Sequence, residues 1–215
     1  MVNGYELEEI NNAAHPLLMQ AILLINARLK PGQVPGAAAF QEAIANKKKW
    51  FPDNYHLIII KYGNTVVAAA AGYYIAEINA GFINYVVIDP KHEGEGLAQT
   101  IRSALLNSFQ SDSKQNDLRT PIGYLGEVEH DNPWLQKLII KYGVIPLDIP
   151  YVQPPLQHGN KPIPLVLYFQ PHEGATIKME KDFVVKIIKA IYESVYDLID
   201  VEKKEYFKKI KRAKQ

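Results

Sequence analysis

The sequence contains no cysteine, so several kinds of chemistry are missing from the start. Disulfides, thiolate metal sites and a cysteine nucleophile are all excluded. Excess charge is lacking too, because 24 Lys and Arg residues oppose 23 Asp and Glu residues, for a formal net charge of +1. Without an excess of one sign, no global field draws the chain to nucleic acid or to an anionic membrane surface. We therefore expect neither as a partner.

Long apolar runs are also lacking. The first apolar stretch, Leu17 to Ile25, is interrupted by Gln20, and the run Val66 to Ala71 is too short to cross a bilayer. The opening sequence MVNGYELEEI carries acidic residues where a secretory signal would be basic. We therefore expect a cytoplasmic protein, and 215 residues are enough to bury a substantial core.

Metal-binding and serine-hydrolase patterns are absent as well. Six histidines occur, but no two of them are three or four residues apart, as a ligand pair on one helix face would be. No Gly-x-Ser-x-Gly elbow is present either. The sequence thus predicts no metal site and no serine nucleophile.

What is present is an alternation of β-prone and amphipathic segments, which predicts a mixed α/β (α+β) sheet. Gly63 and Asn64 between two such segments indicate a hairpin. A polar stretch at 111–117 is expected to link elements. The expected elements are strands at 5–10, 56–62, 65–77, 81–88, 122–128, 144–149 and 163–169, and helices at 16–30, 37–49, 97–109 and 132–142.

The C-terminal part differs in composition. Residues 178–212 contain no proline or glycine, which predicts one long helix. Its apolar residues follow alternating steps of four and three and form a seam, which consists of Val184, Ile188, Ile191, Val195 and Leu198. This seam is expected either to cover the domain's own apolar surface or to form a homodimer. We therefore divide the chain into a domain at 1–172 and a helical extension at 173–215.

The segment from Asn84 to Ala98 carries most of the functional information. An apolar strand ends at Pro90, and Gly94 and Gly96 come directly before an amphipathic helix. Glycines there permit unusual backbone angles, and the N–H groups at the helix start can seat an anion. A P-loop is excluded because no Gly-Lys-Ser/Thr occurs, and a dinucleotide fingerprint fits poorly because Gln99 occupies its third small position. The segment predicts a phosphate-binding site.

This segment resembles motif A of the GNAT (GCN5-related N-acetyltransferase) superfamily. The motif, Arg/Gln-x-x-Gly-x-Gly/Ala, corresponds here to Glu93-Gly94-Glu95-Gly96-Leu97-Ala98. A second match is similar to the family's helix and turn after the fifth strand, and it consists of Asn132, Leu135, Leu138, Gly143 and Val144. The resemblance covers residues 5–169 and implies a mostly antiparallel twisted sheet flanked by helices, followed here by the long C-terminal helix.

The resemblance also implies where acetyl-CoA, or another acyl-CoA, would bind. In that family the fourth strand pairs with the pantetheine arm and the loop amides receive the pyrophosphate. The corresponding residues are Val86, Val87, Ile88, Glu93, Gly94, Glu95, Gly96, Leu97, Ala98 and Asn132. Glu93 departs from the family pattern, because it replaces an Arg or Gln. We expect the acidic side chains of Glu93 and Glu95 to point to solvent, and Lys91, His92 and Arg102 are near enough in sequence to compensate.

Amine acylation needs a base for the ammonium proton, an acid for the departing thiolate, and donors for the oxyanion. Glu127 and Glu129 lie two residues apart on the fifth strand and so share a face. They are the first candidates for the base. Tyr85 on the fourth strand is a further catalytic candidate.

The general acid has no clear candidate, because Ile139 stands where the family often has a tyrosine; Tyr124 and Tyr151 are alternatives. The loop from Tyr151 to Leu156 lies near where an acceptor pocket would be. The resemblance implies an N-acyltransferase that acts on a primary amine of an unidentified small-molecule or peptide acceptor. A catalytically silent acyl-CoA-binding or regulatory module is the alternative.

Overall fold

The computed structural model describes residues 4–47, 49–118, 120–157, 159–173 and 177–213. At its centre lies a seven-stranded sheet with the strand order β1-β2-β3-β4-β5-β9-β6. These strands are β1 (Tyr5–Glu9), β2 (Asn54–Tyr62), β3 (Thr65–Ile75), β4 (Ala80–Ile88), β5 (Gly123–Val128), β6 (Ile145–Pro146) and β9 (Val166–Pro171). A separate two-stranded sheet pairs β7 (Val152–Gln153) with β8 (Ile163–Pro164).

Neighbouring strands of the large sheet are antiparallel except for β4 and β5, which run parallel. The predicted mixed, mostly antiparallel sheet is therefore confirmed. The β2–β3 hairpin turns at Gly63, whose φ of 59° suits a two-residue turn. Two expected strands are shorter than predicted: 144–149 keeps only β6, and 163–169 is divided into β8 and β9. Pro146 and Pro164 end the two short strands because proline cannot donate to a ladder.

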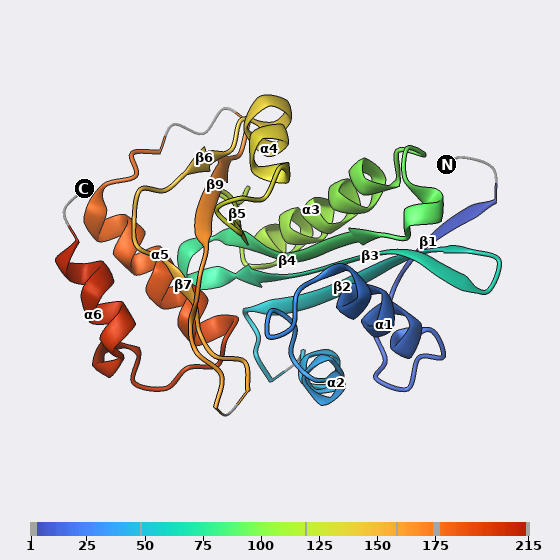
Figure 1. The fold of residues 1–215 in the computed structure, drawn as a ribbon, viewed down its shortest axis with the longest axis horizontal. Coiled ribbons are helices and arrows are strands. Elements are labelled where there is room, and N and C mark those ends of the chain that lie inside the picture. The colour runs from blue at the N-terminus through green and yellow to red at the C-terminus, as the bar shows by residue number, and fades with distance from the viewer. Residues whose placement is uncertain (1–3, 48, 119, 158, 174–176, 214–215) are drawn as a thin grey trace.

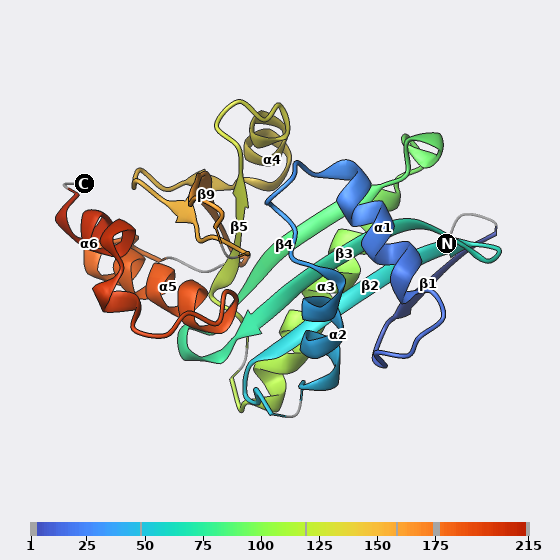
Figure 2. The ribbon, with the colours of Figure 1, turned by 60° about the horizontal axis from the view of Figure 1, so that its bottom comes forward.

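Helices cover both faces of this sheet (Figure 1). Along each strand, successive side chains alternate between the two faces. α1 (Leu18–Arg28) and α2 (Ala37–Ala45) pack on one face, where Leu57 and Ile59 point toward them. α3 (Leu97–Gln115) packs on the other face, against Ile58 and Ile60. Figure 2 shows α1 and α2 in front of the strands and α3 behind them. The fourth helix, α4 (Trp134–Tyr142), follows β5.

α3 is longer than the sequence predicts. Residues 111–115, expected as part of a linker, form its last turn. The helix continues because two polar residues of this turn are buried and bonded: Asp112 contacts His56, and the hydroxyl of Ser113 donates to Asn79 Oδ1 at 2.8 Å. The polar composition of residues 111–115 therefore led to the prediction of a linker where the structure has a partly buried helical turn.

Phe109 fixes α3 to the sheet. Its ring lies directly over Gly72 of β3 and Gly81 of β4, where an added Cβ would come within 2.8 Å and 2.1 Å of the ring. The two glycines thus leave the space that the ring fills, and Phe109 is fully buried.

The C-terminal segment holds two helices, α5 (Lys181–Ser194) and α6 (Glu205–Arg212), so the expectation of one helix over 178–212 is wrong. Asp197 and Asp200 adopt φ values of 49° and 55° and reverse the chain between them. Aspartate is one of the few residues that tolerate this region. α6 folds back onto α5, as the red end of the ribbon in Figure 1 shows. No helix in the described ranges is both long and apolar enough to cross a membrane.

The apolar seam of this segment packs inside the chain. Val184, Ile188 and Ile191 are fully buried, and the other two seam residues are partly buried beside them. They share one core cluster with residues of the sheet, among them Phe82 and Leu167. The seam therefore covers the domain's own apolar surface, which is the first of the two expectations. The expected domain boundary after residue 172 adjoins residues 174–176, which lie outside the described residues.

Candidate active site

β4 and β5 separate partway along their length. They pair as far as Ile83 with Gly126. Beyond that pair β4 continues to Ile88 and β5 to Val128, but the two strands share no further ladder pairs in the part of the chain that the structure describes. Figure 2 shows the two strands diverging, with β5 continuing toward α4 and β4 running away from it. We call this separation the β4–β5 opening. Along it, the β5-facing edge of residues 84–88 pairs with no strand that the structure describes.

A β-bulge in β4 lies at the start of this opening. Gly72 of β3 pairs with Ile83 and Ala71 pairs with Tyr85, so Asn84 is an extra residue. Bulges bend a strand, re-aim its side chains and are common beside active sites. The Oδ1 atom of Asn84 is buried without a hydrogen-bond partner among the described residues. Buried polar atoms of this kind are rare and point to a functional constraint.

The glycine-rich loop ends at the N-terminus of α3. Gly94 and Gly96 have φ values of 89° and 76°, a region that favours glycine. A Cβ added at either position would meet no atom within 4 Å, so the space beside this backbone is open. The amides of residues 94–98 donate to no residue that the structure describes. Together with the helix dipole, these amides can receive an anion.

Of the two acidic side chains in this loop, Glu93 is paired with a cation, Arg28. Glu93 is exposed, and its Oε1 lies 2.7 Å from Nη2 of Arg28 on α1. Glu95 and Lys91 are exposed. The Nδ1 atom of His92 lies 2.9 Å from the hydroxyl of Tyr5.

Arg102 is engaged elsewhere and does not compensate the acids of the loop. It is buried, donates a hydrogen bond to Gln170 of β9, and places its guanidinium 4.4 Å from the ring centre of Tyr142. The expectation of a compensating Arg102 is therefore wrong, because its position on the buried side of α3 turns it toward β9 and α4.

Of the two predicted carboxylates, Glu129 is already paired. Its Oε2 lies 2.7 Å from Lys30 Nζ, and its Oε1 accepts a 2.9 Å bond from Gln33 Nε2. Both partners come from the segment between α1 and α2. Glu129 thus ties this segment to the end of β5.

Glu127 lies in a different environment, one residue beyond the last β4–β5 pair. Its Oε1 accepts a 2.5 Å bond from the hydroxyl of Tyr196, whereas its Oε2 is buried without a partner among the described residues. Burial raises the pKa of Glu127 to about 7, and the hydroxyls of Tyr196 and Tyr151 act in the opposite direction. A carboxyl group with a pKa near neutrality is well suited to exchange protons at physiological pH.

Tyr85, on β4 just past the bulge, stays protonated. Burial raises the pKa of its phenol strongly, and the nearby Glu127 adds to the effect. Its hydroxyl donates to the backbone oxygen of Gln33 at 3.2 Å, and Gln153 of β7 donates to the same oxygen at 3.4 Å. Tyr85 therefore links β4 to the segment between α1 and α2. Its protonated phenol is unsuited to act as a base.

The remaining predicted residues have mixed positions. Asn132 precedes α4, and its Oδ1 accepts a 2.9 Å bond from the amide of Trp134, the first residue of that helix. Tyr124 packs on the α3 side and bonds to Gln110, away from the opening. Tyr151 lies beside Glu127, and its buried hydroxyl has no hydrogen-bond partner among the described residues.

Three site residues were missed by the sequence analysis: Asn84, Gln33 and Tyr196. A bulge and a backbone carbonyl leave no pattern in one sequence. Tyr196 did leave one, because Tyr192 and Tyr196 interrupt an aliphatic helix face at a spacing of four.

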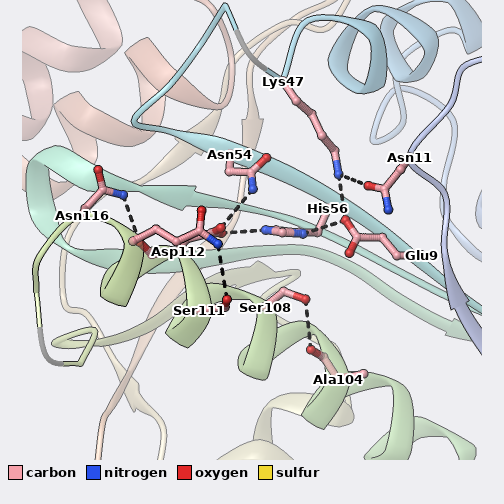
Figure 3. A network of polar contacts seen from close by, with 11 residues as sticks. Glu9, Asn11, Lys47, Asn54, His56, Ala104, Ser108, Ser111, Asp112 and Asn116 are labelled. Carbon is pink, nitrogen blue, oxygen red and sulfur yellow. Dashed lines mark hydrogen bonds and ion pairs between the residues drawn. The ribbon is translucent and has the colours of Figure 1, made fainter.

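A second polar cluster lies around His56 of β2, two strands away from β4 in the sheet (Figure 3). His56 of β2 bonds through Nδ1 to Glu9 at 2.8 Å and through Nε2 to Asp112 at 2.7 Å. Lys47 bonds to Glu9, and Asn54 bonds to Asp112. The cluster lines a cavity of about 650 Å³, but these side-chain contacts satisfy it internally. Across the described ranges, no group of three His, Asp or Glu residues is placed to hold a metal ion.

Comparisons with known proteins agree with this geometry. The sequence model of the Acetyltransferase (GNAT) family matches residues 22–143. A protein assigned to the GNAT acetyltransferases from Bacteroides thetaiotaomicron has a similar fold, with a TM-score of 0.66 and 15% identity over 90% of this chain and 99% of its own. No sequence match was found among curated proteins.

Two further solved structures are similar. The ribosomal-protein-S18-alanine N-acetyltransferase of Escherichia coli has a TM-score of 0.55 and 12% identity over 82% of this chain and 97% of its own. An acetyltransferase of Salmonella typhimurium, solved with its cofactor acetyl-CoA, has a TM-score of 0.54 and 12% identity over 83% and 100%. At such identities the likeness shows the fold alone.

Proposed function

This chain belongs to the GNAT acetyltransferase family, and we propose that it transfers an acetyl group from acetyl-CoA to the primary amine of a small-molecule or peptide acceptor. The β4–β5 opening carries this proposal. It brings together an unpaired strand edge, an anion-binding loop and a buried carboxyl group. The acceptor amine and the details of catalysis belong to the proposal.

The residues present fit acetyl-CoA. The free amides of residues 94–98, beside open space at Gly94 and Gly96, fit its pyrophosphate. The β5-facing edge of Val86 to Ile88 offers backbone groups to the amide-bearing pantetheine arm. Arg28 offsets the charge of Glu93, the residue that departs from the family motif. The acetyl-CoA bound there would supply the thioester that reacts.

Glu127 is our choice for the general base over Glu129. Glu129 is held by Lys30 and Gln33, so its carboxylate is already engaged. Glu127 has a free, buried Oε2 and a pKa raised to about 7 by burial. Such a group can accept a proton from an ammonium group and return it to solvent in each cycle.

The proton and bond changes balance as follows. Glu127 takes one proton from the ammonium group, which leaves a neutral amine. The nitrogen forms a bond to the thioester carbonyl carbon, the carbon–sulfur bond breaks, and the nitrogen's second proton neutralises the thiolate. The products are an amide and the free thiol, and Glu127 releases its proton to solvent.

The test is to incubate the protein with acetyl-CoA and a panel of amines, and to measure free thiol. The panel contains a peptide N-terminus, lysine, a polyamine and an aminoglycoside. We expect Glu127→Gln to lower kcat by at least about 100-fold, the usual contribution of a general base. Glu129→Gln is the matched control and should lose much less. Acetyl-CoA binding without turnover of any amine would instead identify a silent acyl-CoA-binding module.

A further inference from the structure

The C-terminal segment reaches the catalytic carboxyl group. Tyr196 follows α5 and lies 53 residues beyond the end of the region that the family model matches, since that region ends at residue 143. Its hydroxyl nevertheless donates the one hydrogen bond that Glu127 Oε1 receives from a described side chain, at 2.5 Å. A charge-assisted bond of this length is among the stronger hydrogen bonds in proteins.

The fold holds Tyr196 in place from several sides. The chain leaves α5 at Val195, and the positive φ of Asp197 turns it immediately afterwards. The ring of Tyr196 packs edge-on against Phe82 of β4 and against Tyr192 of α5, with centroid distances of 6.5 Å and 6.3 Å. These contacts fix the direction of its hydroxyl.

Tyr192 braces the other side of the same pocket. Its hydroxyl donates to the backbone oxygen of Val152 at 2.7 Å, and its ring stacks on Tyr151 at 5.8 Å. Tyr151 is the residue whose buried hydroxyl lacks a partner near Glu127. The C-terminal segment therefore shapes two sides of the carboxyl group.

The titratable groups that face Glu127 are all tyrosines. Within the described residues they come from β4, β9, α5 and the segments next to β7 and α5, and they are Tyr85, Tyr151, Tyr168, Tyr192 and Tyr196. Burial raises the pKa of each of these phenols, so all five remain neutral donors in the physiological range. Among the described residues no cation offsets the charge of Glu127, and the hydroxyls of Tyr196 and Tyr151 are the groups that lower its pKa.

We propose that Tyr196 is a positioning residue for acyl transfer: its hydroxyl occupies Oε1 of Glu127, and this leaves Oε2 as the atom that takes the proton from the acceptor amine. The proposal rests on the proposed function for its catalytic meaning. It gives the C-terminal helices a role in the reaction. The region matched by the family model cannot supply this role, because it ends at residue 143, before α5 begins.

The hydrogen bond has a measurable consequence. A donor stabilises the charged carboxylate more than the neutral acid, so its loss must raise the pKa of Glu127. The loss of a hydrogen bond to a charged group corresponds to a shift of about one to two pKa units. Tyr196→Phe removes the hydroxyl and keeps the ring that packs on Phe82.

The first measurement is the titration of Glu127 by carbon-13 NMR. The protein is labelled at its glutamate carboxyl carbons, and the Glu127 signal is the one missing in Glu127→Gln. Tyr196→Phe should raise the pKa of Glu127 by at least about one unit. Tyr206→Phe is the matched control, because Tyr206 belongs to the same C-terminal segment and its hydroxyl bonds to no described residue. An unchanged Glu127 titration in Tyr196→Phe would overturn the proposal.

The second measurement is the pH profile of kcat/KM for whichever amine of the panel is turned over. Its acidic limb should move to higher pH in Tyr196→Phe by the same amount as the NMR titration, and Tyr206→Phe should leave it in place. A displaced titration with an unmoved profile would also overturn the proposal. Absence of turnover in the wild type would refute the proposed function, while the NMR titration would still decide whether Tyr196 controls Glu127.

A third form of the protein keeps the test valid if Tyr196→Phe does not fold. Site-specific incorporation of 3-fluorotyrosine at position 196 keeps the side chain and makes its hydroxyl a stronger donor. The Glu127 titration should then move to lower pH. A titration that stays at the wild-type position would contradict the assigned hydrogen bond.

Discussion

Replacing Asp112 with asparagine should strongly destabilise the protein, although its side chain bonds to Asn54 and His56 and not to a candidate catalytic residue. Both ring nitrogens of His56 face carboxylate oxygens, which can only accept hydrogen bonds, so the ring carries both protons as a buried histidinium. The side chains of His56 and Asp112 are each only 6% exposed. Removing one partner from a buried charge pair costs about 3–5 kcal/mol. We expect Asp112→Asn to cost about 3 kcal/mol near pH 6.

The pH dependence follows from the direction of each pKa shift. Burial alone would lower the pKa of His56, but Asp112 and Glu9 outweigh it and raise this pKa. Its contribution is therefore complete below the unfolded-state pKa of about 6.5, and it is lost as the pH rises through the folded-state pKa. The pKa of Glu9 is lowered to about 2 despite its burial, because His56 and Lys47 bond to it. The Glu9 contribution is present above pH 4.5 and is lost as the pH falls toward 2.

Urea unfolding of the wild type and Asp112→Asn at pH 5, 6, 7, 8 and 9 measures the effect. The difference in free energy of unfolding should be largest at pH 5 and 6 and should shrink at higher pH. Asp200→Asn is the matched control: Asp200 also pairs with a cation, Lys203 at 2.9 Å, but on the surface, where a single pair contributes little. A loss below about 1 kcal/mol at pH 6, or one that does not vary with pH, would refute the buried histidinium.

Two further predictions concern α3 and its loop. Phe109→Ala should lower the free energy of unfolding, measured by urea titration, by about 3–5 kcal/mol. The ring fills the space over Gly72 and Gly81, and the sheet cannot close the cavity that the substitution leaves. A cost of about 1 kcal/mol would contradict this packing. Gly96→Ala should weaken acetyl-CoA binding about tenfold in calorimetry, because a φ of 76° costs alanine about 1–2 kcal/mol. Gly36→Ala is the control and should bind acetyl-CoA normally, because Gly36 has an ordinary φ and open space beside it. Equal affinities of the two variants would count against the loop as the anion site.

Much of the fold was predictable because it rests on local patterns. In β2 the continuous apolar run from Leu57 to Ile60 is typical of a strand that is buried on both faces, and the structure sends Leu57 and Ile59 to one face and Ile58 and Ile60 to the other. The turn at Gly63 was equally local. The two helices at the C-terminus were not predicted, because the break depends on single aspartates in a region that they adopt only occasionally.

The site was predictable in part. The glycine loop has a backbone requirement that one sequence reveals, and Gly94 and Gly96 indeed adopt positive φ values. The choice between Glu127 and Glu129 was not predictable, because it depends on long-range partners. Lys30 lies 99 residues before Glu129, and Tyr196 lies 69 residues after Glu127. No local pattern reports contacts between segments so far apart along the chain.

The bulge at Asn84 means that the opening is encoded as an insertion. Ile83 faces α3, but the extra residue shifts the alternation, so that Tyr85 and Val87 face α1 and α2. A substitution at position 84 changes the side chain there but keeps the extra residue that forms the bulge. Loss of one codon at position 84 would instead restore the strand's phase and exchange the two faces of everything downstream in β4. A deletion at position 84 should therefore disturb the strand edge that we propose to bind acetyl-CoA more than a substitution at the same position would.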